Sequence, residues 1–224
     1  MIISTLNSVI YARGYYFLDH GATAIYNGFM RYSGLLGKTL REIPQDLKAK
    51  SHALLLQGGY IRPLSQGLYS FLPLGLKVVN NIKRIIGREM NALGGQEVNV
   101  PLVNPLEIWL RGGRAEAVDK ELVRFRDRSG KMLVLAATHE EAMTELVKTC
   151  AVSYRDLPLL LYEFQLHYRD EEKVKCGLIR TREFLMKDAY SFHRSTSELN
   201  NFFPKMFSAY QKIFRNCHVE FITA

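Results

Sequence analysis

The feature that most constrains the fold is a pair of strand-like segments around a charged loop. The first segment, Tyr162–Tyr168, alternates apolar and polar side chains, and the second, Leu185–His193, follows the charged run Arg180–Phe184. The intervening stretch, Glu172–Ile179, is polar at its start and apolar only at its end. Because successive side chains of a strand point to opposite faces, these segments predict a hairpin with one polar face.

The predicted polar face carries an unusual mixture of side chains. Strand parity assigns to it Gln165, His167, Arg169 and Glu171 from the first arm, and Arg180, Arg182, Phe184, Met186 and Asp188 from the second. Several arginines beside a carboxylate and an aromatic ring make a poor core, but they suit a polyanion with a flat base, such as ATP. Two alternatives stay open: the arginines are solvated strand residues, and Phe184 belongs to the core.

Composition narrows the class of protein. The chain has 224 residues, of which 47% are hydrophobic and 23% charged, as in an ordinary globular domain. No apolar run approaches the ~18 residues of a membrane-spanning helix, so we expect no membrane association. The formal net charge of +8 favours a nucleic-acid partner. The cysteines, Cys150, Cys176 and Cys217, lack metal-ligand spacing, so we expect no metal site, no disulfide framework and a cytoplasmic location.

The first residues differ from the rest. Residues 1–29 contain one basic side chain, Arg13, and one acidic side chain, Asp19. They lack the features of a secretory signal, and a transit peptide, the alternative, should be richer in arginine. We predict that residues 1–29 are an extension outside the folded domain, which spans residues 30–224.

Helical and strand periodicities recur along the folded part. Apolar residues at spacings of three and four predict a helix over Leu76–Leu93, which Gly94 and Gly95 end. Glu97–Val103 then alternates like a strand, and Pro101 makes it an edge or interface strand because proline cannot donate to a ladder.

Three further elements are predicted, and together they indicate an α+β fold. Leu122–Leu135 is typical of a hairpin with its turn at Asp127–Gly130. Thr138–Cys150 is typical of a helix, with a capping box formed by Thr138 and Glu141. Glu198–Asn216 is an amphipathic helix that Pro204 either kinks or begins.

These runs resemble the signature motifs of the class II aminoacyl-tRNA synthetases. The helix Leu76–Leu93, Gly95 and the strand to Pro101 resemble motif 1, while Tyr168–Glu171 with Arg180–Phe184 resembles motif 2. The runs that resemble the bacterial-type prolyl-tRNA synthetase family more closely are Lys38–Glu42, Gly58–Arg62, Gly67–Gly75, Thr138–Glu141 and Arg182–His193. The resemblance implies a mostly antiparallel sheet flanked by helices, in the N-terminal part of a class II catalytic domain.

The resemblance also implies a reaction and its partners. Such a ligase activates proline with ATP to prolyl-adenylate and transfers the prolyl group to the 3′ end of tRNA(Pro), in protein biosynthesis. Mg²⁺ accompanies the ATP, held mainly by phosphates. The motif 1 helix and strand form a homodimer interface in the full-length context.

By the same resemblance each site residue takes a role. Arg169, on the α-phosphate, and Arg180, on the outer phosphates, are the catalytic residues. Phe184 stacks on adenine, and Glu171 lies near the adenine amino group or the tRNA end. Thr138 and Glu140 hold the prolyl ammonium, Met186, Asp188 and Tyr190 line the proline side, and Lys173 and Lys175 face the tRNA acceptor end.

The chain departs from the family at several points. Ala136–Ala137 precedes Thr138 where the family has Gly-Pro, and Lys173–Lys175 replaces an arginine-rich segment. The family continues beyond Ala224 with an editing insertion, motif 3 and an anticodon-binding domain, so we expect an incomplete active site and doubtful activity of this chain alone. The alternatives are a sister class II enzyme, of threonyl or seryl type, and a non-catalytic paralogue that binds RNA or a partner.

Overall fold

The computed structural model describes residues 31–42, 47, 49–118 and 120–223. The chain divides into two compact units, residues 1–35 and 36–224. The described part of the first unit contains a 3-10 turn, η1, at Tyr32–Gly34. The predicted extension, residues 1–29, lies outside the described residues, and its assignment stays a prediction.

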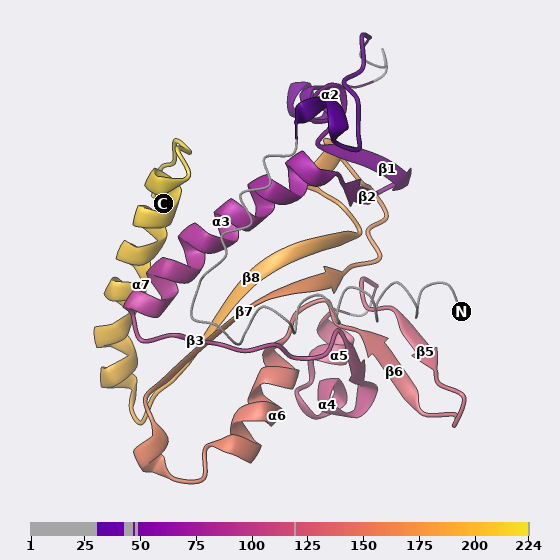
Figure 1. Ribbon diagram of the computed structural model, residues 1–224. Helices are drawn as coiled ribbons and strands as arrows, with labels where there is room; N and C mark the ends of the chain where they lie inside the picture. Colours follow the sequence, from indigo (N-terminus) through magenta and orange to yellow (C-terminus); the bar gives the residue numbers. More distant parts are fainter. Residues whose placement is uncertain (1–30, 43–46, 48, 119, 224) are drawn as a thin grey trace, which may run out of the picture. The chain divides into compact units, whose positions relative to one another are not determined.

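A long antiparallel hairpin forms the centre of the second unit (Figure 1). Its arms are β7 (Leu159–Tyr168) and β8 (Glu183–Phe192), and the short strand β3 (Gln96–Glu97) pairs in parallel with β7. The predicted hairpin is therefore confirmed. Strand β7 begins before the predicted segment because Leu159–Leu161 is a continuous apolar run, which carries no alternation to mark it as a strand.

Two long helices cover one face of this hairpin (Figure 1). They are α3 (Pro73–Ala92) and α7 (Thr196–Asn216), and a cluster of Met90, Tyr162, Ala209 and Ile213 joins them to β7. Helix α3 begins earlier than predicted, since proline fits the first helical turn. Helix α7 also begins earlier, capped by the Ser195 hydroxyl, and Pro204 lies inside it rather than at its start.

Helix α6 (Glu140–Cys150) packs on the opposite face of the hairpin. Its Met143 forms a buried cluster with Val100 and Leu161. The predicted capping box of Thr138 and Glu141 is wrong: His139 is the N-cap residue and no side chain caps the helix. Thr138 instead accepts a hydrogen bond from Arg114.

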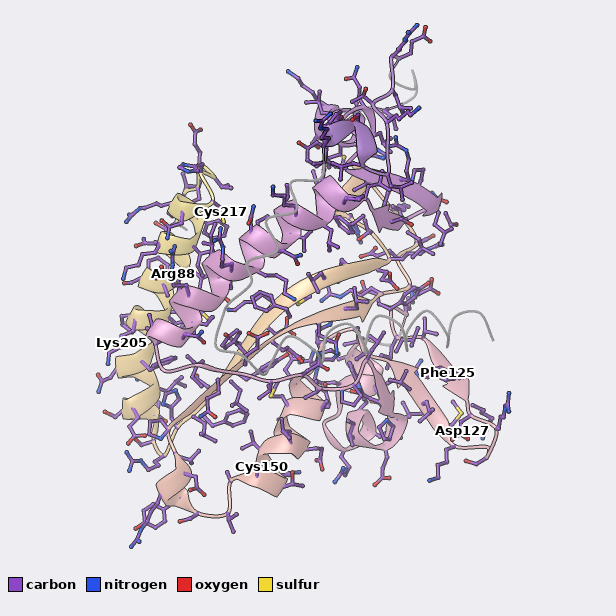
Figure 2. All side chains as sticks on the ribbon, viewed as in Figure 1. Arg88, Phe125, Asp127, Cys150, Lys205 and Cys217 are labelled. Atoms are coloured by element: carbon purple, nitrogen blue, oxygen red, sulfur yellow. The ribbon has the colours of Figure 1, made fainter. Side chains whose placement is uncertain are left out.

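A second antiparallel sheet has the order β4-β6-β5. Its strands are β4 (Val103–Pro105), β5 (Arg124–Arg126) and β6 (Met132–Leu135), so the predicted hairpin is confirmed. Figure 2 shows Asp127 at its turn, where the Asp127 carboxylate accepts hydrogen bonds from the backbone of Ser129 and Lys131. A core around Trp109 joins this sheet to the short helices α4 (Leu106–Arg111) and α5 (Arg114–Ala117).

The predicted strand Glu97–Val103 is not continuous. It is split into β3 and β4, and Pro101 lies between them rather than within an edge strand. The backbone N–H of Val98 still donates to the carbonyl of Tyr162, at 2.9 Å. The backbone N–H of Val100 donates instead to the Glu163 side chain, at 3.1 Å, and Pro101 has no N–H. The backbone pairing with β7 therefore ends before Pro101.

The remaining described elements are short. Helix α2 (Lys50–Gln57) precedes the hairpin of β1 (Ile61–Ser65) and β2 (Leu68–Phe71), and 3-10 turns occupy Tyr154–Asp156 (η2) and Gly177–Ile179 (η3). Helices gathered around mostly antiparallel sheets make the fold α+β, as predicted. Among the described helices, none combines the length and hydropathy needed to cross a bilayer. The three cysteines, among them Cys150 at the end of α6 and Cys217 after α7, are free (Figure 2).

Candidate active site

Cross-strand pairing brings the predicted polar residues to one face. Residues that pair directly across the β7–β8 hairpin are Glu163 with Asp188, Gln165 with Met186, and His167 with Phe184. Direct partners in an antiparallel pair point to the same side, so the predicted shared face is confirmed. The face is not uniformly open, because Glu163 and His167 are fully buried while Phe184 and Met186 are half-buried. The floor accessible to a ligand is therefore the end of the hairpin nearest the loop.

A cation and an aromatic ring lie together at this open end. The guanidinium carbon of Arg169 lies 5.3 Å from the centroid of the Phe184 ring, within the range of a cation–π contact. The Arg169 Nε–H donates to the carbonyl of Ala137 at 3.2 Å, which fixes the side chain over the ring. The His167 imidazole stacks on Phe184 with 5.9 Å between centroids and 16° between planes.

The second predicted phosphate ligand is held by a carboxylate. Nε and Nη2 of Arg180 both donate to Oε2 of Glu171, at 2.8 and 2.7 Å. Glu171 is buried, whereas the Arg180 side chain is 51% exposed. The hydrogen bond that Arg180 donates to this carboxylate raises the pKa of Arg180. An anion in this position would have to replace Glu171 as the partner of Arg180.

The loop lysines project from a closed loop. Lys175 and Arg180 exchange backbone hydrogen bonds of 3.1 and 3.2 Å, which close the base of the loop. Lys173 and Lys175 are exposed. Lys175 thus lies beside Arg180, and the exposed side chains of both lysines are accessible to a large anion.

The predicted proline-ammonium ligands converge on an arginine that the sequence reading did not select. Arg114 donates from Nη2 to the Thr138 hydroxyl at 3.1 Å, and its Nη1 lies 3.4 Å from Oε1 of Glu140. Its Nε lies 3.2 Å from Oε1 of Glu141. Burial raises the pKa of the Glu141 carboxyl. Arg114 follows Gly113, whose left-handed φ of 68° turns the chain into α5. This glycine was the feature of the sequence that could have drawn attention to Arg114.

The other predicted proline residues lie along β8. The Tyr190 hydroxyl donates to Oδ2 of Asp188 at 2.7 Å, and Met186 lies on the same face. Burial, followed by the hydrogen bond to Asp188, raises the pKa of Tyr190, and the Glu140 carboxylate adds to this effect. Asp188 therefore contacts both Tyr190 and His167.

A buried polar network lies beneath these residues. His139 Nδ1 lies 2.6 Å from Oε1 of Glu163, and the imidazoles of His139 and His167 are 4.3 Å apart between centroids. His167 Nε2 lies 3.4 Å from Oδ2 of Asp188. Burial lowers the pKa of His167. Sequence analysis assigned no role to His139 or Glu163, although Glu163 has the same strand parity as Gln165 and His167.

Comparison with known proteins gives the class. Residues 123–224 match the family model described as the tRNA synthetase class II core domain (G, H, P, S and T). This part of the chain is therefore similar to the class II aminoacyl-tRNA synthetase core. The relatives are more specific: the chain is 49% identical over 192 residues to the proline–tRNA ligase of Heliobacterium modesticaldum and 47% identical over 192 residues to that of Moorella thermoacetica. The resemblance to bacterial-type prolyl-tRNA synthetases is thus confirmed.

The matches cover most of this chain but a minor part of each relative. They include 86% of the chain, yet only 33% and 34% of those two ligases, so the chain spans about a third of their length. Among solved structures, Giardia lamblia prolyl-tRNA synthetase in complex with prolyl-adenylate has a TM-score of 0.68 at 22% identity and matches 73% of this chain and 34% of its own. The RNA-binding domain of Cryptosporidium parvum threonyl-tRNA synthetase has a TM-score of 0.63 at 24% identity, and the match covers 68% of this chain and 38% of that domain's chain. These two likenesses support the fold.

Proposed function

We propose that this chain forms the ATP- and proline-binding part of a proline–tRNA ligase. The observation that carries the proposal is the Arg169 guanidinium 5.3 Å from the Phe184 ring, beside the Arg180–Glu171 pair, at the end of a class II hairpin. The Phe184 ring can stack on the adenine base, and the guanidinium groups of Arg169 and Arg180 can bind the phosphates. The names of the relatives indicate proline as the amino acid.

ATP binding would rearrange one ion pair. Adenine stacks on Phe184, with Glu171 near its amino group, and Arg169 contacts the α-phosphate. Arg180 exchanges Glu171 for the outer phosphates, because a phosphate oxygen accepts the same charge-assisted hydrogen bonds as a carboxylate oxygen. The exposed Arg180 side chain is free to make this exchange without disturbing the core.

The activation step then follows from the position of Arg169. The proline carboxylate attacks the α-phosphorus, a P–O bond to pyrophosphate breaks, and negative charge spreads over the phosphate oxygens. A fixed guanidinium stabilises that charge without reorganisation. The cluster that could ligate a metal among the described residues contains two imidazoles, which do not suit magnesium. Mg²⁺ would therefore arrive bound to the ATP phosphates.

The proline end lies at the start of α6. Thr138 and Glu140 receive the prolyl ammonium, and their oxygens divide their hydrogen bonds between this ammonium and Arg114, which already contacts both. Along β8, Met186, Asp188 and Tyr190 line the ring of the substrate, with the Tyr190 hydroxyl fixed on Asp188. These five residues form the proline subsite of the proposal.

Transfer to tRNA completes the proposed reaction. Lys173 and Lys175 contact the acceptor end of tRNA(Pro), whose phosphates attract exposed ammonium groups. A homodimer forms through α3 and the adjoining segment around Pro101. In its favour, α3 leaves large apolar side chains exposed, including Leu76, Val78 and Ile82.

Titration with a non-hydrolysable prolyl-adenylate analogue tests the proposal. We expect Arg169→Ala to weaken binding roughly 10- to 150-fold, the equivalent of losing a charge-assisted hydrogen bond of about 1.5–3 kcal/mol. The matched control, Arg128→Ala in the exposed turn of the β5–β6 hairpin, should bind like wild type. Equal affinity for the threonyl analogue would instead indicate a sister synthetase, and no binding of either analogue would indicate a non-catalytic paralogue.

A further inference from the structure

A buried cluster lies at the meeting point of three elements beneath the proposed active site. His139 precedes α6, His167 is near the end of β7, and Asp188 lies on β8. One ligand atom from each of these residues lies within 4.8 Å of the other two. His139 and His167 are fully buried and Asp188 is 9% exposed. We propose that these three residues bind a Zn²⁺ ion.

The first argument is that the ligand atoms lack partners. His139 Nε2, both ring nitrogens of His167 and Oδ1 of Asp188 form no hydrogen bond within the described residues. The ion-pair contact between His167 Nε2 and Asp188 Oδ2, at 3.4 Å, does not satisfy hydrogen-bond geometry. Buried polar atoms are almost always paired, so several unpaired atoms that converge on one point indicate a missing ligand.

The second argument is the orientation of His139. An ionised carboxylate can only accept hydrogen bonds. Oε1 of Glu163, 2.6 Å from Nδ1 of His139, therefore accepts a hydrogen bond from Nδ1–H, and Nε2 of His139 keeps a free lone pair. The other Glu163 oxygen accepts from the backbone N–H of Val100 at 3.1 Å, which fixes the carboxylate. Metal-binding histidines are typically oriented in this way, by a carboxylate on the second ring nitrogen.

The third argument is charge. Glu163 and Asp188 are two buried carboxylates, and within the described part of the chain neither forms an ion pair with a lysine or arginine. A divalent cation would offset both.

The donor set selects the metal. Two imidazole nitrogens and one carboxylate oxygen are typical zinc ligands, whereas magnesium and calcium prefer oxygen alone. The Tyr190 hydroxyl donates to Oδ2 of Asp188, which leaves Oδ1 as the single ligand oxygen. A fourth tetrahedral position remains for water. The ion would tie the start of α6 to both arms of the hairpin, and this role does not depend on the proposed ligase activity.

Metal titration of the chelator-stripped protein tests the site. Zn²⁺ is added in competition with a chromogenic chelator, and bound metal is counted by atomic emission. We expect wild type to hold one equivalent after dialysis, and His139→Gln, His167→Gln and Asp188→Asn to lose it. Glu163→Gln should weaken binding roughly 10- to 100-fold, because it removes the orienting carboxylate and no ligand. The control, His218→Gln, changes an exposed histidine and should leave binding unchanged.

A rescue variant separates loss of a ligand from loss of the fold. His167→Cys supplies a thiolate in place of the imidazole, so we expect it to regain zinc binding and, with Co²⁺, to show a thiolate-to-metal charge-transfer band absent from wild type. Circular dichroism of each stripped variant checks that it is folded. No retained metal in wild type, wild-type affinity in His167→Gln, or a folded His167→Cys that binds no better than His167→Gln would each overturn the proposal.

Discussion

The Nε atom of Arg114 lies 3.2 Å from Oε1 of Glu141, whose side chain is only 5% exposed. Arg114→Ala leaves this buried carboxylate without its cation. We expect the free energy of unfolding to fall by about 1–3 kcal/mol, measured by urea denaturation. The matched control is Arg111→Ala, which breaks an exposed ion pair with Glu145 and should change stability by less than about 1 kcal/mol. Equal losses in the two variants would contradict a special role for Arg114.

The Arg180–Glu171 pair leads to a prediction about nucleotide length. If Arg180 leaves Glu171 for the outer phosphates, Arg180→Ala should weaken ATP binding roughly tenfold or more and leave AMP binding unchanged. Arg169→Ala should weaken both nucleotides, because AMP retains the α-phosphate. Calorimetric titration of ATP and AMP into each variant gives the comparison. A similar loss of AMP affinity in Arg180→Ala would place Arg180 elsewhere.

The exposed loop lysines should contribute to the salt dependence of tRNA binding. Replacement of Lys173 and Lys175 by alanine removes two phosphate-neutralising charges. We expect the slope of log affinity for tRNA(Pro) against log salt to become less steep by about 1.4–1.8. The matched control replaces Lys205 and Lys212, two exposed lysines of α7 that lie outside the proposed tRNA surface, and should keep the wild-type slope. Identical slopes for both double variants would remove the loop from the tRNA interface.

The exposed apolar side chains of α3 should report on self-association. Val78 is 45% exposed, and Val78→Glu places a charge where the proposed homodimer would bury an apolar surface. We expect sedimentation analysis to show dissociation of this variant at concentrations where wild type is dimeric. Arg128→Glu changes the charge of an exposed residue in the β5–β6 turn, outside the proposed interface, and should leave the dimer intact. A monomeric wild type would contradict the proposed interface.

The stability of the start of α7 should depend on pH through the ionisation of Glu198. Hydrogen bonds from the Arg194 side chain and backbone lower the pKa of the Glu198 carboxyl. Because the folded pKa lies below the unfolded value of about 4.3, this contribution to stability is complete above that pH and is lost as pH falls through the lowered value. A carboxyl titration followed by NMR should show the lowered pKa in wild type and a return toward the ordinary value in Arg194→Ala. An ordinary pKa in wild type would refute the interaction.

Local periodicity in the sequence was sufficient to predict the main helices and strands of this protein. Alternation over Tyr162–Tyr168 and Leu185–His193 predicted the hairpin and its polar face, and apolar spacing predicted α3, α6 and α7. These signals are readable because the strand and helix periods are fixed by backbone geometry within each segment. The positions of Arg169 and Arg180 at the loop end were predicted for the same reason, while their roles stay a prediction.

Contacts between distant segments were decided only by the tertiary structure. The capping box at Thr138 was a sound local pattern, but packing of α5 offered the Thr138 hydroxyl and Glu141 a stronger partner in Arg114. Likewise, nothing near His139 in the sequence shows that its imidazole meets Glu163 on β7. Sequence thus determined which residues share a face. The folded chain decided which side chains meet across elements, because those pairings depend on how helices and strands pack and not on the order of residues within them.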